Sequence, residues 1–300
     1  MNDKASITSL MSAFGRAYHA EHEKNPVFCD NRAKKLMSEA EYDSVKKYIL
    51  SGVSFFRPDA DPTVTADLLL SDIVNSEISA TPLCRSAYTE NALAEFSAGK
   101  TVQYVILGAG LDTFALRKVD FLTRNKVFEV DHPLTLNDKM ARLEKIGVSE
   151  RDNPKYVAVD FTNDDLSEKL LESGFCVEAP SFFSWLGVTY YLTESEIRAT
   201  LSSLSELCKS GSEIVFDYPD ESFPSCAVPR VKRTLMMAAA GGEPMKSFLS
   251  ASRVCEILAE CGFDVKEQLF PADIQERIID DRGTNMTAFE CVNYVRAIKR

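Results

Sequence analysis

The sequence lacks several features that mark particular classes of protein. Its eight cysteines form no C-x-x-C pair, and basic residues are in the minority, with 34 Lys and Arg against 45 Asp and Glu. The resulting net charge of −11 repels phosphate backbones and anionic membranes. We therefore expect no nucleic-acid partner and no membrane partner.

Long hydrophobic runs are also missing, and none of the apolar stretches reaches the length that crosses a bilayer. The first residues, "MNDKASITSL", have neither the basic nor the apolar region of a signal peptide. With the scattered cysteines, this predicts reduced thiols and a cytoplasmic location. A content of 45% hydrophobic and 26% charged residues is typical of a globular chain long enough for one large domain, or for a domain with a cap. The sequence does not indicate an oligomeric state.

The pattern of apolar residues divides the chain near residue 100. Before it, apolar residues recur at helical spacing from Ile7 to Tyr18, and helices are expected at 39–51, 65–79 and 83–98, the last with Pro82 at its start. After it, short apolar strands such as "TVQYVIL", "KVFEV" and "EIVFDY" alternate with helical patterns. This alternation predicts an α/β fold with a parallel sheet covered by helices. We expect residues 1–100 to form a helical cap on residues 101–300, within one compact unit.

The segment 219–247 interrupts this alternation with several prolines and glycines around "TLMMAAA". Two interpretations stay open, a lid inserted at 219–247 or a surface connection that contains one helix. A helix at about 250–261, a strand "FDVKEQLF" and a last strand at or near the sheet edge complete the expected fold.

The stretch "YVILGAGLDTFALR" indicates a ligand site. A buried strand ends at Gly108 and Gly110, where a missing side chain lets a ligand approach the backbone. In open α/β sheets, ligands bind at this place, beside the first turn from strand to helix. The spacing is only part of the G-x-G-x-x-G pattern, because Thr113 stands where the third glycine belongs. A turn that needs glycine for its shape alone is the other interpretation.

Acidic residues follow the next two strands. Asp131 ends "KVFEVD", close to the separation of about 20 residues expected of an acid that binds ribose hydroxyls. Asp160 ends "KYVAVD" and is suited to accept from an adenine amino group, with Phe161 along the base. Each acid alone can equally be a solvated corner or a helix N-cap.

Two cofactors fit a nucleoside in this position. A nicotinamide dinucleotide carries a pyrophosphate that calls for the third glycine and a nearby helix N-terminus, and Thr113 argues against it. S-adenosyl-L-methionine carries no phosphate, so the glycine turn, acidic partners for its adenosine and a cation for its carboxylate are enough. The sequence offers all of these.

Several stretches resemble, in order and spacing, the leucine carboxyl methyltransferase family, a branch of the class I S-adenosylmethionine-dependent methyltransferases. They are "QYVILGAGLDTFALR", "VFEVDHPLTLNDKMARL", "VAVDFTNDDLSEKLLESGF" and "FFSWLGVTYYLTESEIRATL". The segment that begins "TSLMSAFGRAYHA" is similar to the family's helical cap. The resemblance covers residues 8 to about 218 and implies a Rossmann-like, seven-stranded class I methyltransferase sheet with an N-terminal helical cap.

The resemblance also implies cofactor-binding residues. Arg85 stands where the family pairs an arginine with the cofactor's carboxylate, and Arg16 is a second basic residue that reaches the cofactor from the cap. Gly108 and Gly110 would approach the methionine part, while Asp131, and Asp160 with Phe161, would hold the ribose and the adenine. The sequence departs from the family at Leu186, where many relatives have a glutamate for the cofactor's amino group.

The expected activity is S-adenosyl-L-methionine-dependent O-methyl transfer to a carboxyl or hydroxyl oxygen of a small molecule, such as a polyketide-like or other secondary metabolite, or to a peptide carboxylate. Alternatives are a non-catalytic module that binds the cofactor and a nicotinamide-dependent oxidoreductase. No catalytic base can be named, and Tyr191 is the substrate-side candidate. No metal is expected, because His19 and His22, at i and i+3 among glutamates, suggest a solvated helix face.

Overall fold

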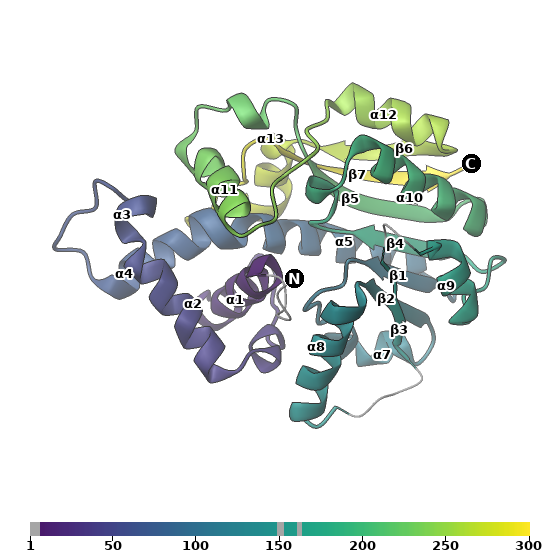
Figure 1. Ribbon diagram of the computed structural model, residues 1–300, viewed down its shortest axis with the longest axis horizontal. Helices are drawn as coiled ribbons and strands as arrows, with labels where there is room; N and C mark the ends of the chain where they lie inside the picture. The colour runs from purple at the N-terminus through teal and green to yellow at the C-terminus, as the bar shows by residue number, and fades with distance from the viewer. Residues whose placement is uncertain (1–6, 149–152, 161–163) are drawn as a thin grey trace.

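A seven-stranded sheet forms the centre of the protein in a computed structural model, which describes residues 7–148, 153–160 and 164–300 (Figure 1). The strands lie in the order β3-β2-β1-β4-β5-β7-β6. Their bounds are β1 Gln103–Leu107, β2 Lys126–Asp131, β3 Lys155–Ala158, β4 Ser181–Trp185, β5 Glu213–Pro219, β6 Phe263–Leu269 and β7 Val292–Lys299. The predicted seven-stranded α/β fold is therefore confirmed.

The sheet is mixed. The strands β1 to β5 are parallel to one another, as the alternation predicts, whereas β7 is antiparallel to both β5 and β6. The last strand is one place in from the edge, and β6 forms the edge itself. This agrees with their burial, because β7 is buried from Val292 to Ala297 and the middle of β6 is exposed.

Helices cover both faces of the sheet. On one face α5 (Ala80–Ser97) packs through Leu83 and Leu93 against Tyr104 and Phe182. The other face carries α9 (Leu166–Glu172), α10 (Glu194–Leu207) and α12 (Ala251–Glu260). The remaining helices of this half are α6 Phe114–Arg117, α7 Val119–Leu122, α8 Pro133–Lys145, α11 Pro229–Ala240 and α13 Pro271–Ile274. Short helical turns are η3 Thr189–Tyr191, η4 Phe223–Ser225, η5 Gln275–Ile279 and η6 Asp280–Arg282.

From Ile7 to Ser97 the chain is mainly helical; α1 to α4 gather at one end of the sheet, and α5 runs from there under the strands (Figure 1). The helices are α1 Ile7–His22, η1 Ala33–Leu36, α2 Glu39–Ser51, α3 Val53–Phe56, α4 Ala66–Ile73, the π-helical turn η2 Val74–Ser79, and α5. They share a core that includes Phe14, Ile49 and Ile73 and that extends to Leu111 and Leu143 of the sheet half. The cap and the sheet are thus packed against each other.

One expected boundary is wrong. The spacing predicts a new helix that begins beside Pro82, but α4, η2 and α5 follow one another without a break, and Pro82 lies inside α5. A proline lacks the N–H that an α-helical turn uses, and the wider π-helical turn just before it accommodates this defect.

The segment 219–247 contains the short turn η4 and the helix α11. Two arginines hold α11 against the π-helical turn η2: Arg233 pairs with Glu77, and Arg230 donates to the Ser76 carbonyl oxygen at 3.0 Å. Figure 1 shows α11 above α1, away from the strands. Whether the segment opens as a lid stays a prediction. No helix in the described part of the chain has the length and apolarity to span a membrane.

An ion pair joins the cap to the sheet half. Arg142 of α8 donates to both carboxylate oxygens of Glu41 on α2, at 2.7 and 2.8 Å, and to the Leu36 carbonyl oxygen at 2.8 Å. This contact with Arg142 lowers the pKa of Glu41 from 4.5 to about 2. The pair therefore contributes most to stability when Glu41 is ionised.

We predict that Glu41→Gln lowers the free energy of unfolding by about 1–2 kcal/mol at pH 7, a range that allows for partial solvent screening. Because the pKa of Glu41 is lower in the folded state, this difference should be complete above pH 4.5 and should fade as the pH drops toward 2. Urea unfolding of both proteins across this pH range measures it. The exposed Glu39→Gln on the same helix is the control and should show a much smaller effect. An equal loss in both variants, or a pH-independent loss, would contradict the prediction.

Candidate functional site

The turn after β1 requires glycine at two positions. Gly108 and Gly110 have φ of +68° and +46°, in the left-handed region that residues with a side chain rarely adopt. A Cβ on Gly108 would lie 2.3 Å from Cγ2 of Val188, and one on Gly110 would lie 2.8 Å from Oγ of Ser9. The turn is thus closely packed on one side, and both glycines line a cavity on the other.

Asp131 fixes this turn from the neighbouring strand. Its Oδ2 accepts from the Gly110 N–H at 2.6 Å and its Oδ1 from the His132 N–H at 2.7 Å. Burial raises the pKa of Asp131, and these two N–H groups partly offset that effect. The carboxylate is held at the cavity wall and, with Thr135 as a third hydrogen-bonding neighbour, still has acceptor capacity for a ligand.

The cavity beside this turn has a volume of about 300 Å³. Five of the seven residues expected to bind a cofactor line it, namely Arg16, Arg85, Gly108, Gly110 and Asp131. Asp160 follows β3, where its N–H donates to Asp164 at 2.8 Å, and it is not among the lining residues. Phe161 lies outside the described residues.

Arg85 belongs to a buried cluster around Asp217. It donates from Nη1 to Oδ2 of Asp217 at 3.0 Å, and the same carboxylate accepts from the Tyr190 hydroxyl at 2.8 Å and the Gly187 N–H at 2.7 Å. Burial by itself would lower the pKa of Arg85, but the charge of Asp217 outweighs it and raises that pKa. Arg85 therefore stays a cation at the end of the cavity.

Arg16, on α1, also lines the smaller cavity. It donates to Oδ2 of Asp30 at 2.5 Å and to the Leu111 carbonyl oxygen at 2.8 Å, which ties the cap to the glycine turn. The Thr113 hydroxyl donates to the same Asp30 carboxylate at 2.6 Å. This buried bond gives Thr113 a structural role at the place of the absent third glycine.

A second, larger cavity of about 760 Å³ adjoins the first. Both are lined by Thr8, Ser12, Pro82, Arg85, Gly187 and Tyr191, so these residues form a common junction. Burial raises the pKa of the Tyr191 hydroxyl, which keeps it protonated. Tyr191, the expected substrate-side residue, thus lines both the smaller, more polar cavity and the larger, mostly apolar one.

The expectation that His19 and His22 form a solvated helix face is wrong for His19. Its ring is completely buried, with Nε2 accepting from the Val27 N–H at 2.9 Å and Nδ1 facing the Asn75 amide oxygen at 3.4 Å. Burial lowers the pKa of His19, so the ring is neutral and supports the chain after α1. Among the described residues, no cluster of three or more His, Cys, Asp or Glu could hold a metal.

The sequence reasoning missed three residues at or beside the junction: Gly187, which lines both cavities, Asp217, which holds Gly187 from behind, and Glu243. Gly187, with φ of +73°, ends a strand as Gly108 does, and Asp217 is an acid inside the apolar strand "EIVFDY", so both carried a signal. Glu243 carried none, because it lies in the irregular segment after α11. It lines the smaller cavity and accepts a short hydrogen bond from the Thr8 hydroxyl.

Comparisons with known proteins agree with this arrangement. The model of a family described as leucine carboxyl methyltransferase matches residues 9–205. The chain is 37% identical, over 99% of both lengths, to YktD of Bacillus subtilis, described as an S-adenosyl-L-methionine-dependent methyltransferase. Two solved structures share the fold: a DUF574 family protein of Streptomyces avermitilis and a protein of Thermobifida fusca titled as a methyltransferase. The Streptomyces protein has a TM-score of 0.55 and 15% sequence identity, and the match covers 85% of this chain and 96% of the other. The Thermobifida protein has a TM-score of 0.50 and 13% sequence identity, and the match covers 99% of this chain and 96% of the other.

We predict that Gly187→Ala destabilises the protein more than Gly174→Ala does. Both positions have positive φ, but a Cβ at 187 would lie 2.5 Å from both terminal nitrogens of Arg85, whereas nothing lies within 4 Å at 174. The control should lose about 1 kcal/mol from backbone strain, and Gly187→Ala a further 1–3 kcal/mol from the disturbed buried pair. Denaturant unfolding measures both. Equal losses would show that Arg85 is not held against this backbone.

Proposed function

The chain belongs to the leucine carboxyl methyltransferase family, and on this premise we propose that it transfers a methyl group from S-adenosyl-L-methionine to a carboxyl or hydroxyl oxygen. The acceptor is a small molecule, such as a polyketide-like or other secondary metabolite, or a peptide carboxylate. The chain is an S-adenosyl-L-methionine-dependent methyltransferase by its family, and the choice of oxygen as the acceptor atom is the proposal. The observation that carries it is the junction of a smaller cavity, with a mixed polar and apolar lining, and a larger, mostly apolar one.

The residues of the smaller cavity fit the cofactor. Gly108 and Gly110 line the cavity at the strand end, and because they lack a side chain, Val188 and Ser9 can pack behind the turn. Asp131 has acceptor capacity left for the ribose hydroxyls. Arg85 is a largely buried cation with donors beyond the one that Asp217 uses, which suits a carboxylate. We propose that Asp160 and Phe161 hold the adenine and that Arg16 supports the cofactor from the cap.

The bound cofactor supplies an electrophilic methyl carbon on a sulfonium, and the protein has to orient an acceptor oxygen toward it. Such positioning in a dry site can contribute about 7–11 kcal/mol to the lowering of the barrier. Tyr191 stands at the junction with a protonated hydroxyl, and we propose that it hydrogen-bonds the acceptor oxygen. A carboxylate acceptor is ionised at pH 7, whereas a hydroxyl acceptor has to lose its proton.

We predict that the purified protein binds S-adenosyl-L-homocysteine with micromolar affinity and does not bind NADH. Asp131→Ala should weaken binding about ten- to a hundredfold, because it removes an acceptor for the ribose and the support of the Gly110 N–H. Asp131→Asn, which keeps one acceptor oxygen, should bind S-adenosyl-L-homocysteine with an affinity between those of the wild type and Asp131→Ala. Isothermal titration measures all three proteins.

The control is Asp120→Ala, an exposed acid on α7 that does not line either cavity and should bind like the wild type. Failure of the wild type to bind S-adenosyl-L-homocysteine would overturn the proposed activity. Tight binding by Asp131→Ala would overturn the role of Asp131 alone.

A further inference from the structure

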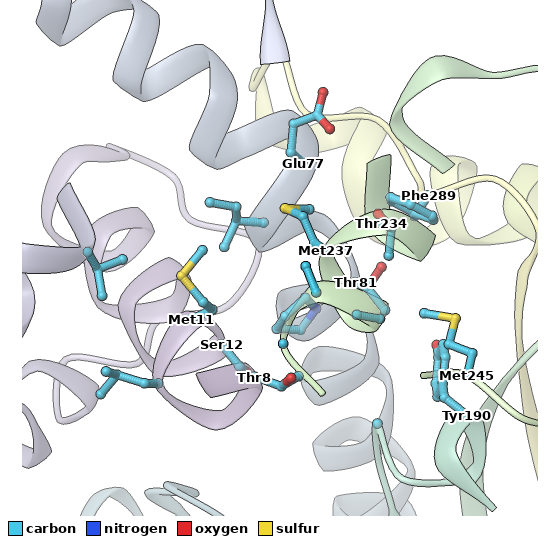
Figure 2. A pocket seen from close by; sticks show the side chains of 18 of the residues that line it. Thr8, Met11, Ser12, Glu77, Thr81, Tyr190, Thr234, Met237, Met245 and Phe289 are labelled. Atoms are coloured by element: carbon cyan, nitrogen blue, oxygen red, sulfur yellow. The ribbon is translucent and has the colours of Figure 1, made fainter. Parts of the chain in front are cut away.

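The larger cavity is mostly apolar. Methionines from three segments meet in it, Met11 from α1, Met237 from α11 and Met245 from the segment that follows (Figure 2). Phe223, Phe289 and Tyr190 add aromatic surface. Methionine is flexible and polarizable, and it fits irregular apolar ligands. With about 760 Å³, the cavity is large enough for a drug-sized molecule.

Two carboxylates line this cavity, and both are already paired with cations. Glu77 is almost completely buried and accepts from Arg57 at 2.7 Å and from Arg233 at 2.5 and 3.0 Å. Glu41 accepts from both terminal nitrogens of Arg142. Neither carboxylate therefore presents an uncompensated charge to a ligand.

Arg85 is the one cationic side chain among the described residues that line this cavity, and it is also paired with a carboxylate. One terminal nitrogen pairs with Asp217 at 3.0 Å. Its guanidinium also borders the smaller cavity, where the proposed function assigns it to the cofactor's carboxylate. With both partners in place, Arg85 has no net charge left for a second carboxylate.

An anionic acceptor would consequently lose its hydration in the larger cavity and find no unpaired cationic side chain among the described residues that line it. Burying an unpaired carboxylate is strongly unfavourable. Hydroxyl groups, by contrast, meet suitable partners, because Ser12, Thr81 and Thr234 also line the cavity (Figure 2). These side chains can exchange hydrogen bonds with an uncharged polar group without a change of charge.

We propose that the methyl acceptor is a lipophilic molecule that presents an uncharged hydroxyl, rather than a carboxylate, to this site. The inference rests on the proposed function, because it chooses between the two oxygen acceptors left open there. In the transfer, the hydroxyl oxygen bonds to the methyl carbon, the carbon–sulfur bond breaks to leave a thioether, and the hydroxyl proton is taken up by a base.

A carboxylate of the smaller cavity, Glu243, lies beside the junction and can take up this proton. Glu243 forms no ion pair with the cationic side chains that the structure describes, and it accepts from the hydroxyl of Thr8, which lines both cavities. Glu243 is partly exposed, so it can pass a proton on to water. A carboxylate acceptor would have no use for such a group.

The test compares two probes of one shape, 4-phenylphenol and biphenyl-4-carboxylate, titrated at pH 7 into the full chain saturated with S-adenosyl-L-homocysteine. We expect the phenol to bind at least tenfold more tightly than the acid. Met237→Lys, which adds a cation to the lining, should reverse this preference, whereas Met237→Leu, which keeps the lining apolar, should preserve it.

Tighter binding of the acid by the wild type would overturn the inference, and so would binding of neither probe while S-adenosyl-L-homocysteine binds. An unchanged preference in Met237→Lys would also overturn it, because the charge of the lining would then not decide the choice. The proposed function fails in a different way, by the absence of S-adenosyl-L-homocysteine binding in the first step. Unfolding curves of both variants show whether each is folded.

Discussion

The buried carboxylate of Asp217 is the interaction on which the rest of the site depends. It is completely inaccessible, and three different segments donate to it: Arg85 of α5, the Gly187 N–H after β4 and the Tyr190 hydroxyl of η3. Such a charge is tolerated only when its partners satisfy it, and removing one of them leaves a costly unpaired group. The carboxylate therefore fixes the distance between the helix under the sheet and the strand ends that carry the junction.

This constraint explains why glycine recurs at the strand ends. At Gly187 the guanidinium of Arg85 occupies the place that a side chain would take, and at Gly108 the side chain of Val188 does so. Two adjacent residues therefore connect these turns: Gly187 packs against Arg85, and Val188 packs against Gly108 in the turn after β1. Because Asp131 holds the Gly110 N–H from the other side, the strand ends of β1, β2 and β4 form one connected unit.

The features that could be predicted from the sequence are those set by local pattern. The apolar strands, the helix at 39–51, the glycine turn and the acid at the end of β2 all follow from spacing, and the structure brings that acid to the turn. The continuous helix through Pro82 and the burial of His19 could not be predicted in this way. The π-helical turn η2 compensates for the proline inside the helix, and the hydrogen bond from the Val27 N–H compensates for burying the His19 ring. Asp217 could not be predicted as a site residue for a similar reason, because its partner Arg85 is far away in the sequence and reaches it only when α5 packs against the sheet.

The two cavities differ in the polar groups that they offer to a ligand, and this difference follows from the elements that line each cavity. The smaller one lies at the strand ends, where backbone N–H groups and acidic corners supply polar contacts that do not require a second charged side chain. The larger one lies among the cap helices and α11, and helices bring together side chains instead of free backbone groups. The ion pairs of Glu77 and Glu41 join these elements to one another, so both carboxylates are neutralised by arginines of the cavity wall and not by a ligand. A cavity built in this way selects its ligand by shape and apolar surface, and the charged chemistry is left to the strand ends beside it.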